Sequence, residues 1–243
     1  MKQPPLIRLV DDDPTVAQSL TFVLEVAGLQ VKSYDSAERF LAFDDEAREG
    51  CLLLDVRMPG MTGLELQSRM RSLGRDLPIV FLSAHGDIEM ALECVRAGAV
   101  DFLVKPPRPE KLVEILKRAA GLHELIRSLR REWAATEDQW AHVTAPEREA
   151  AELIAKGLSN REIAEVLSTT EEAVRSRRAS LFAKLELRNA VELADAVNAR
   201  RALRAELERL RVPLAEEHHA PHTSEAPESP KAPETPEARE ATS

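Results

Sequence analysis

Short apolar runs alternate with amphipathic stretches through the first 106 residues, and this alternation restricts the fold more than any other feature of the chain. The apolar runs predict strands, and helical periodicity follows the first four of them. The expected strands cover residues 6–10, 30–34, 51–55, 78–83 and 101–105. The expected helices between them cover residues 14–27, 36–47, 63–73 and 87–97. This order of elements predicts a doubly wound α/β fold with a five-stranded parallel sheet.

The central run, Cys51–Asp55, is apolar up to its last residue, as expected for a strand covered on both faces. Asp55 closes the run, and Met58-Pro59-Gly60 turns the chain just beyond it. Ligands of open α/β sheets bind at the carboxyl ends of the strands, so Asp55 is placed for chemistry. Aspartate also favours turns, and this run alone does not separate the two roles.

Polar residues close several other strands at the same edge of the predicted sheet. Asp11 and Asp12 follow the first strand, Ser83 ends the fourth and Lys105 ends the fifth. The carboxylates of Asp11, Asp12 and Asp55 would repel one another unless a cation joined them, and Mg²⁺ prefers such hard oxygen ligands. A lysine there can neutralise a transferred phosphoryl group, and a serine hydroxyl can hydrogen-bond one of its oxygens.

In this order, these residues resemble the receiver domain of two-component response regulators, over about residues 5–120. The resemblance includes Met-Pro-Gly-Met-Thr-Gly shortly after the third strand and Lys-Pro after the fifth. It implies that a histidine kinase phosphorylates Asp55. It also implies a Mg²⁺ site at Asp12, Asp55 and the backbone carbonyl of Arg57, with Asp11 assisting through water.

The resemblance also implies roles for three residues on the fourth and fifth strands. Ser83 and Lys105 would contact the phosphoryl oxygens. Phe102 would be the aromatic switch that follows Ser83 inward when the domain is phosphorylated.

A competing hypothesis makes the chain an enzyme. The spacing of Asp11 and Asp13 resembles the nucleophile motif of haloacid-dehalogenase-type phosphatases, in which one aspartate is phosphorylated and the next acts as acid and base. Those enzymes have a loop and a cap before the next helix, whereas Pro14 opens a helix at once. The hypothesis also leaves Asp55 without a role, so we expect no enzyme with external turnover.

The segment that follows the predicted sheet has apolar residues at a heptad spacing. The pattern predicts a long helical connector that pairs with a second copy of the chain in a parallel homodimer, because the period is 3.5 and not 3.6. A single helix packed on its own receiver is the alternative. The predicted dimer seam consists of Ile115, Leu122, Ile126, Leu129, Trp133 and Trp140.

Capping boxes mark helix starts in residues 144–212. Thr144, Ser159 and Thr169 each precede a glutamate by three residues, and Asn189 repeats the pattern with an amide. The expected helices cover residues 145–156, 160–167, 170–184 and 190–211. Only two residues join the second helix to the third, which predicts an all-α helix-turn-helix domain.

The third of these helices has a basic, small-residue face that suits the major groove of double-stranded DNA. Arg175 and Ser176 would meet base edges beside the small Ala179. The phosphate backbone would be met by Arg177, Arg178 and Lys184. The alternatives are a solvated surface helix and a signalling protein that binds partners without DNA.

Residues 143–200 resemble the LuxR-type helix-turn-helix of NarL/FixJ response regulators, with Gly-Leu-Ser-Asn-Arg-Glu-Ile-Ala beginning at Gly157. Two positions depart from the family pattern. Ala145 stands where a proline is usual, and Arg177 stands where a histidine is usual. The resemblance implies a DNA-binding domain that dimerises on its fourth helix.

The expected division is therefore a receiver (1–120), a coiled-coil connector (121–143), a DNA-binding domain (144–212) and a tail (213–243). Pro, Glu, Ala, Ser and Thr dominate the tail, so we expect it to be disordered. The net charge is −9, and no apolar run is long enough for a membrane span, which favours a cytoplasmic protein without a membrane partner. We expect a transcription regulator that acts with RNA polymerase, either controlled by phosphorylation or independent of it.

Overall fold

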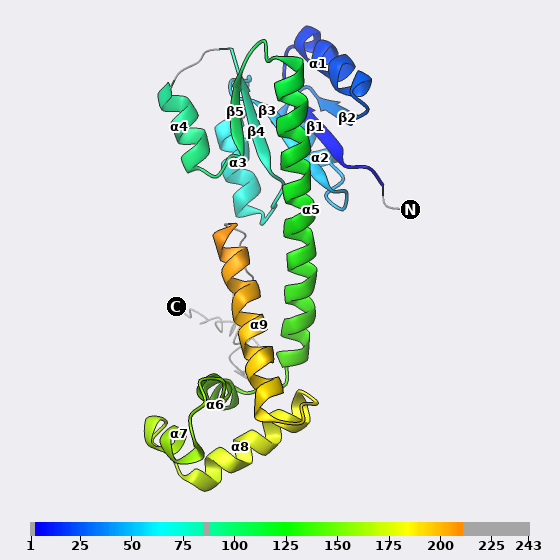
Figure 1. Cartoon of the computed structure of the whole chain (residues 1–243). Coiled ribbons are helices and arrows are strands. Elements are labelled where there is room, and N and C mark those ends of the chain that lie inside the picture. Colours follow the sequence, from blue (N-terminus) through cyan, green and yellow to red (C-terminus); the bar gives the residue numbers. More distant parts are fainter. Residues whose placement is uncertain (1–2, 85–87, 211–243) are drawn as a thin grey trace, which may run out of the picture.

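The computed structural model describes residues 3–84 and 88–210, and Figure 1 shows its two domains joined by one long helix. The predicted tail, residues 213–243, lies outside the described residues. No described helix is long and apolar enough to cross a membrane.

The N-terminal domain contains the predicted five-stranded parallel sheet. Its strands follow the order β2-β1-β3-β4-β5. They are β1 (Leu6–Val10), β2 (Gln30–Tyr34), β3 (Gly50–Asp55), β4 (Ile79–Ser83) and β5 (Asp101–Val104). The chain winds outward from β1 in one direction to β2 and in the other through β3, so the strand order reverses between β1 and β3. That reversal point is where doubly wound sheets bind ligands.

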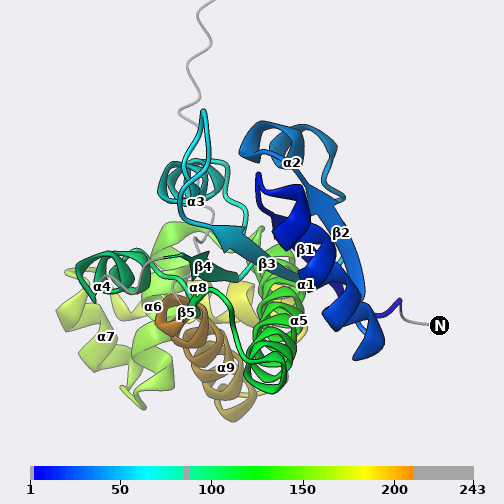
Figure 2. The ribbon, with the colours of Figure 1, turned by 90° about the horizontal axis from the view of Figure 1, so that it is seen from above.

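Helices cover both faces of this sheet (Figure 2). On one face, α1 (Pro14–Val26) and the upper part of α5 (Pro109–Trp140) bury leucines against the strands. On the other face lie α2 (Ala37–Phe43), α3 (Gly63–Ser72) and α4 (Ile88–Arg96). The two faces have separate hydrophobic cores, as expected for strands apolar on both sides.

Helix α2 ends at Phe43, which corrects the prediction of a helix to residue 47. The cause is Arg8, a fully buried arginine in β1. Its guanidinium bonds the Asp44 carboxylate at 2.8 Å and donates to the carbonyls of Asp45 and Arg48. Residues 44–48 form a loop because the buried guanidinium needs hydrogen-bond acceptors. In a continued helix, backbone carbonyls would instead accept from amides of the helix.

The C-terminal domain has four helices in the predicted order: α6 (Ala145–Ala155), α7 (Asn160–Val166), α8 (Glu171–Lys184) and α9 (Ala190–Arg209). The capping boxes at Thr144 and Ser159 form as predicted, and the Asn189 side chain caps α9. The third box is wrong by one residue. Thr170 and not Thr169 caps α8, because the Thr169 amide is already bonded to the Ala164 carbonyl at the end of α7.

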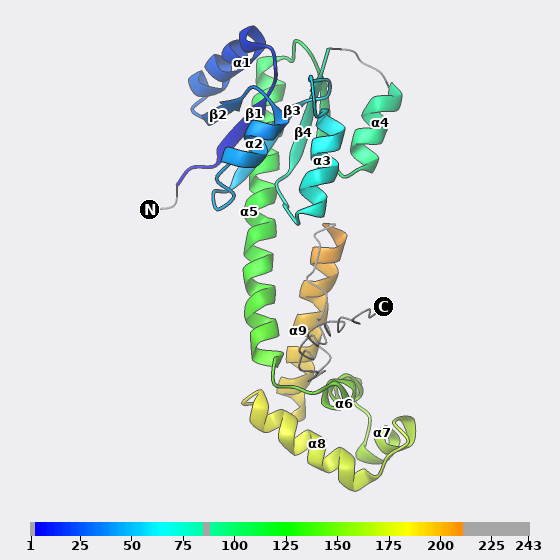
Figure 3. The ribbon, with the colours of Figure 1, turned by 180° about the vertical axis from the view of Figure 1, so that it is seen from behind.

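Helix α5 is continuous over 32 residues, which confirms the long connector. Figures 1 and 3 show α9 running back along it, antiparallel, toward the base of the receiver. All six residues of the predicted dimer seam are used inside the chain. Ile115 packs in the receiver core and Trp140 in the core of the output domain. The four between them pack against α9, so in this chain the seam contacts a helix of the same chain.

Candidate functional site

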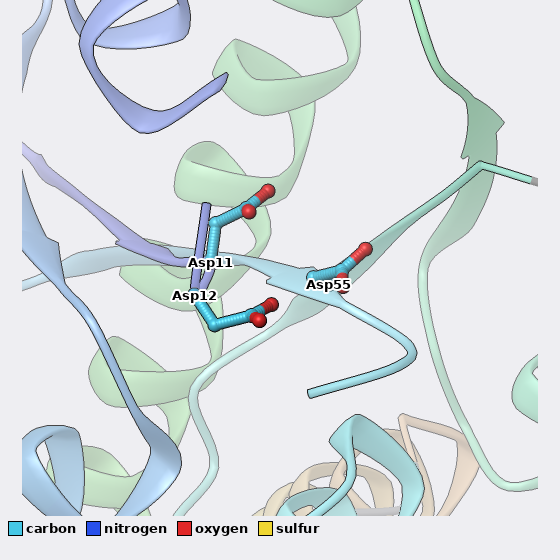
Figure 4. Close-up of side chains that lie close together, drawn as sticks. All are labelled: Asp11, Asp12 and Asp55. Atoms are coloured by element: carbon cyan, nitrogen blue, oxygen red, sulfur yellow. The ribbon is translucent and has the colours of Figure 1, made fainter. Parts of the chain in front are cut away.

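Three carboxylates gather where β1 and β3 end (Figure 4). Val10 of β1 pairs with Leu54 of β3, so Asp11 and Asp55 leave neighbouring strands side by side. One oxygen from each of Asp11, Asp12 and Asp55 lies within 4.8 Å of the others. Asp11 and Asp55 are buried, whereas Asp12 is exposed. Parallel pairing of two strands thus brings together the carboxylates that the sequence placed at one edge.

Lys105, just beyond β5, enters the same cluster. Its Nζ lies 2.6 Å from Asp11 Oδ2 and 3.0 Å from Asp55 Oδ1. Its backbone amide donates to the Ser83 carbonyl at 2.8 Å, which fixes the lysine beside the end of β4. One ammonium group therefore serves two buried carboxylates, with Asp12 nearby.

Burial and the excess of negative charge shift the pKa values of the cluster. Burial raises the pKa of Asp55, and the charges of Asp11 and Asp12 raise it further, against the lowering effect of Lys105. Burial alone would lower the pKa of Lys105, but its hydrogen bonds to Asp11 and Asp55 outweigh burial and raise it. Lys105 therefore stays charged, while Asp55 is held less firmly as a carboxylate than an exposed aspartate.

The loop after β3 approaches this edge closely at Gly63. A Cβ on Gly63 would lie 2.3 Å from the Asp55 carbonyl oxygen, so only glycine fits there. The Gly63 amide also donates to the Val56 carbonyl at 3.0 Å. Sequence reasoning placed this glycine at a helix start and missed its packing role. The predicted backbone ligand, Arg57, lies in this loop with an exposed side chain.

Asp13 stands apart from the cluster. Its Oδ1 accepts from the amides of Thr15 at 2.8 Å and Val16 at 3.3 Å, which makes it the N-cap of α1. These hydrogen bonds lower its pKa. The capping role leaves Asp13 poorly placed for the acid and base step that the phosphatase hypothesis assigns to it.

The other predicted phosphoryl contacts lie on the strands beside Asp55. Asp55 pairs with Leu82, and the buried Ser83 follows as the last residue of β4. Phe102 in β5 is partly buried against the core on the α2, α3 and α4 side. The edge therefore brings Ser83 and Lys105 beside the cluster, and Phe102 lies in β5, the strand that Lys105 follows.

The predicted outer face of α8 is exposed. Arg175, Ser176 and Ala179 face solvent, and Arg175 makes long ion pairs with Glu171 and Glu172 at 3.9 and 3.8 Å. Arg177 and Arg178 are partly buried. The Arg178 guanidinium donates to Asn160 Oδ1 at 2.8 Å, which ties α8 to the start of α7.

Lys184, also expected at the phosphate backbone, pairs with Glu147 of α6 in this structure. Its Nζ bonds both oxygens of Glu147, at 2.6 and 2.9 Å. Burial would raise the pKa of Glu147, but hydrogen bonds from Lys184, Ser180 and Thr144 outweigh it and lower the pKa to about 2. Glu147 also closes the capping box of α6, so this pair joins α6 to α8. No sequence pattern pointed to it, because the partners lie 37 residues apart.

Two family models match the chain in tandem. The model of the response regulator receiver domain matches residues 7–117. The model of the bacterial regulatory proteins of the luxR family matches residues 141–197.

Curated relatives match over most of their own length. The tetrathionate response regulatory protein TtrR of Salmonella typhimurium is 38% identical over 187 residues, which are 77% of this chain and 89% of that protein. The response regulator protein TodT of Pseudomonas putida is 34% identical over 188 residues, 77% of this chain and 83% of that protein. The chain belongs to the two-component response regulators. Its output domain is of the LuxR type, which makes this response regulator a DNA-binding regulator of transcription.

Solved structures agree with this assignment. The response regulator StyR has a TM-score of 0.63 and 34% identity, and the match covers 81% of this chain and all of that one. Full-length FixJ from B. japonicum has a TM-score of 0.50 and 30% identity, with 83% of this chain and 99% of that one covered.

The pairing of Lys184 with Glu147 predicts a measurable stability. Because folding lowers the pKa of Glu147 from 4.5, the stabilisation is present above about pH 4.5 and disappears as the pH falls toward 2. The variant Lys184→Met should lose about 1–3 kcal/mol near pH 7, a range that allows for the partial exposure of the lysine. Urea unfolding followed by tryptophan fluorescence would measure this, since Trp140 lies in the output core.

Lys156→Met is the matched control, because Lys156 is exposed at the end of α6. Its stability should stay within about 0.5 kcal/mol of the parent. An equal loss in both variants, or a loss at Lys184 that persists at pH 2, would contradict the assignment.

Proposed function

We propose that this response regulator is phosphorylated on Asp55 by a histidine kinase and then binds DNA as a dimer to regulate transcription. The observation that carries the proposal is the grouping of Asp11, Asp12 and Asp55 with Lys105 at one sheet edge. The Asp55 carboxylate would attack the phosphorus of a phosphohistidine. A P–O bond forms as the P–N bond breaks, and the released imidazole takes a proton.

The side chains at the edge fit a bound Mg²⁺ ion. Three carboxylates and one ammonium leave an excess of negative charge, and all the offered side-chain ligands are hard oxygens. Asp12, Asp55 and the Arg57 carbonyl would hold the ion, and Asp11 would assist through water. When bound, it would neutralise charge on the phosphoryl oxygens.

Lys105 and Ser83 would then contact the new phosphoryl group. Lys105 Nζ already lies 3.0 Å from Asp55 Oδ1, within reach of a group attached to that carboxylate. Ser83 ends the neighbouring strand, and Phe102 would follow it inward as the aromatic switch. A change on β4 and β5 would thereby reach the start of α5.

In the output domain, Arg175, Ser176 and Ala179 would enter the major groove, with Arg177 and Arg178 at the phosphates. The exposure of Arg175, Ser176 and Ala179 on α8 and the luxR family match support this arrangement. As a regulator of transcription, the protein would act with RNA polymerase as a further partner. It would act in the cytoplasm.

A second candidate is a DNA-binding regulator that needs no phosphorylation. The outer face of α8 favours it, because Arg175, Ser176 and Ala179 are exposed in the unphosphorylated chain. Footprinting of the unmodified protein beside its acetyl-phosphate-treated form separates the two. Equal protection of an operator by both forms would favour the second candidate.

Replacing the phosphate acceptor tests the first candidate. Asp55→Asn should take no label from radioactive acetyl phosphate, because the amide cannot form an acyl phosphate. Asp13→Asn is the matched control and should keep the label of the parent, since asparagine also caps helices. A labelled Asp55→Asn protein would overturn the proposed site.

Competition between Lys105 and Mg²⁺ gives an independent test. Lys105→Met should strengthen Mg²⁺ binding about tenfold, because it removes a positive charge that occupies Asp11 and Asp55 oxygens. Asp12→Asn should weaken binding by a similar factor. Titration calorimetry would measure both, and unchanged or weaker binding in Lys105→Met would contradict the assigned ion site.

The DNA interface is tested on the exposed face of α8. Arg175→Ala should weaken operator binding about tenfold, as expected when one base contact is lost. Arg204→Ala is the control, because Arg204 is exposed on α9 and paired with Glu208. Fluorescence anisotropy with a labelled duplex measures both. Equal affinities of the two variants would argue against α8 as the recognition helix.

A further inference from the structure

Helix α9 extends beyond the match to the luxR family model. The luxR family model ends at residue 197, whereas α9 continues to Arg209. The first part of α9 completes the output core through Leu193 and Val197. Residues 198–210, here called the α9 extension, leave that core and run beside α5 (Figures 1 and 3).

The contact between the α9 extension and α5 is apolar and closed to water at its centre. Ile126 of α5 is 5% exposed and Leu207 of α9 is fully buried. Around them pack Leu122, Leu129, Trp133, Leu203 and Leu210. This cluster is separate from both domain cores and joins α5 to the α9 extension.

Polar contacts fix the lower end of the same interface. Arg200 Nε bonds Glu137 Oε1 at 2.6 Å. The Arg200 guanidinium also lies 5.2 Å from the Trp133 ring centroid and 5.5 Å from that of Trp140. An arginine held by a carboxylate and two indole rings sets the register of α9 on α5.

The upper end of the extension reaches the receiver. Leu210 lines a cavity of about 320 Å³ together with Leu122 and Ile126 of α5. The opposite wall consists of receiver residues that include Met70, Leu77 and Pro78. The extension thus meets the connector and the base of the receiver at one place.

We propose that the α9 extension is an intramolecular clasp that keeps the unphosphorylated chain monomeric by occupying the α5 surface that a second copy would use. The inference rests on the proposed dimeric function. Leu122, Ile126, Leu129 and Trp133 follow the 4-3-4 spacing of a coiled-coil seam, which a second α5 helix would fit. These residues form a single apolar stripe on α5, so they cannot pack against the α9 extension and against a second α5 helix at the same time.

The clasp acts on dimerisation and not on the recognition surface. Arg175, Ser176 and Ala179 are exposed while the clasp is closed, so the receiver does not need to move away for DNA to reach α8. Affinity for a two-half-site operator would then depend on how often the clasp opens. The apparent dimer dissociation constant rises as the open fraction falls.

The experiment opens the clasp without phosphorylation. The double variant Leu203→Asp/Leu207→Asp places charge in the apolar contact but leaves Leu193 and Val197, which hold α9 in the output core. The matched control is Ala202→Asp/Ala205→Asp, at exposed positions of the same helix. Sedimentation velocity measures dimerisation, and tryptophan emission reports the clasp because both tryptophans contact Arg200.

The clasp variant should shift tryptophan emission to longer wavelength and lower the dimer dissociation constant about tenfold or more, and the control should do neither. Adding Leu129→Asp to the clasp variant should restore the monomer, because the α5 seam is then lost as well. An emission shift without stronger dimerisation overturns the proposal, and so does the absence of both changes. Failure of the proposed function itself would appear separately, as absent labelling of the parent on Asp55 or as a labelled parent that stays monomeric.

Discussion

The single ammonium group shared by buried carboxylates is the interaction on which the receiver depends. Lys105 Nζ bonds Asp11 and Asp55, and the exposed Asp12 adds a further negative charge to the same edge. Burial makes the unbalanced charge costly, because little water is present to solvate it. A ligand or modification at Asp55 therefore lies within reach of this lysine. Lys105 follows β5 directly and α5 begins at Pro109. The lysine that pairs with Asp55 therefore lies close in sequence to the start of the connector.

The connector is tied to the base of the receiver by polar contacts. His123 Nδ1 accepts from the Gly50 amide at 3.0 Å, so Nε2 carries the proton that faces Asp76. One helical turn farther on, Arg127 donates to the carbonyls of Ala47 and Glu46. These bonds make α5 part of the receiver as far as this level. Farther along the helix, Arg130 pairs with Asp76 and Arg131 with Glu49 of the receiver. Beyond these pairs, the described part of α5 packs against α9 and the output domain, so the two domains share one continuous helix.

The sequence predicted the sheet edge well because strand order and strand ends fix it. The strands end at or next to Asp11, Asp55, Ser83 and Lys105, and parallel strands end at a common edge of the sheet. The alternation of strands and helices in the sequence is therefore enough to predict that these side chains lie close together. Contacts set by tertiary packing escaped prediction. The Arg8 bond to Asp44 that ends α2 and the Lys184 bond to Glu147 join residues 36 and 37 positions apart, and neither leaves a local pattern. Local periodicity reports which face of an element is buried, but not which residue lies across from it.

The heptad spacing on α5 likewise predicts a packing partner without identifying it. A period of 3.5 predicts a partner helix, yet an antiparallel helix of the same chain satisfies it as well as a second copy. Leu203, Leu207 and Leu210 repeat at spacings of 4 and 3, which makes α9 complementary to the middle of the seam. The seam's ends, Ile115 and Trp140, are fixed in two domain cores. Between these fixed ends, the contact of α5 with α9 involves seven side chains and is small beside either core. It is the part of the seam whose exchange would leave both domain cores intact.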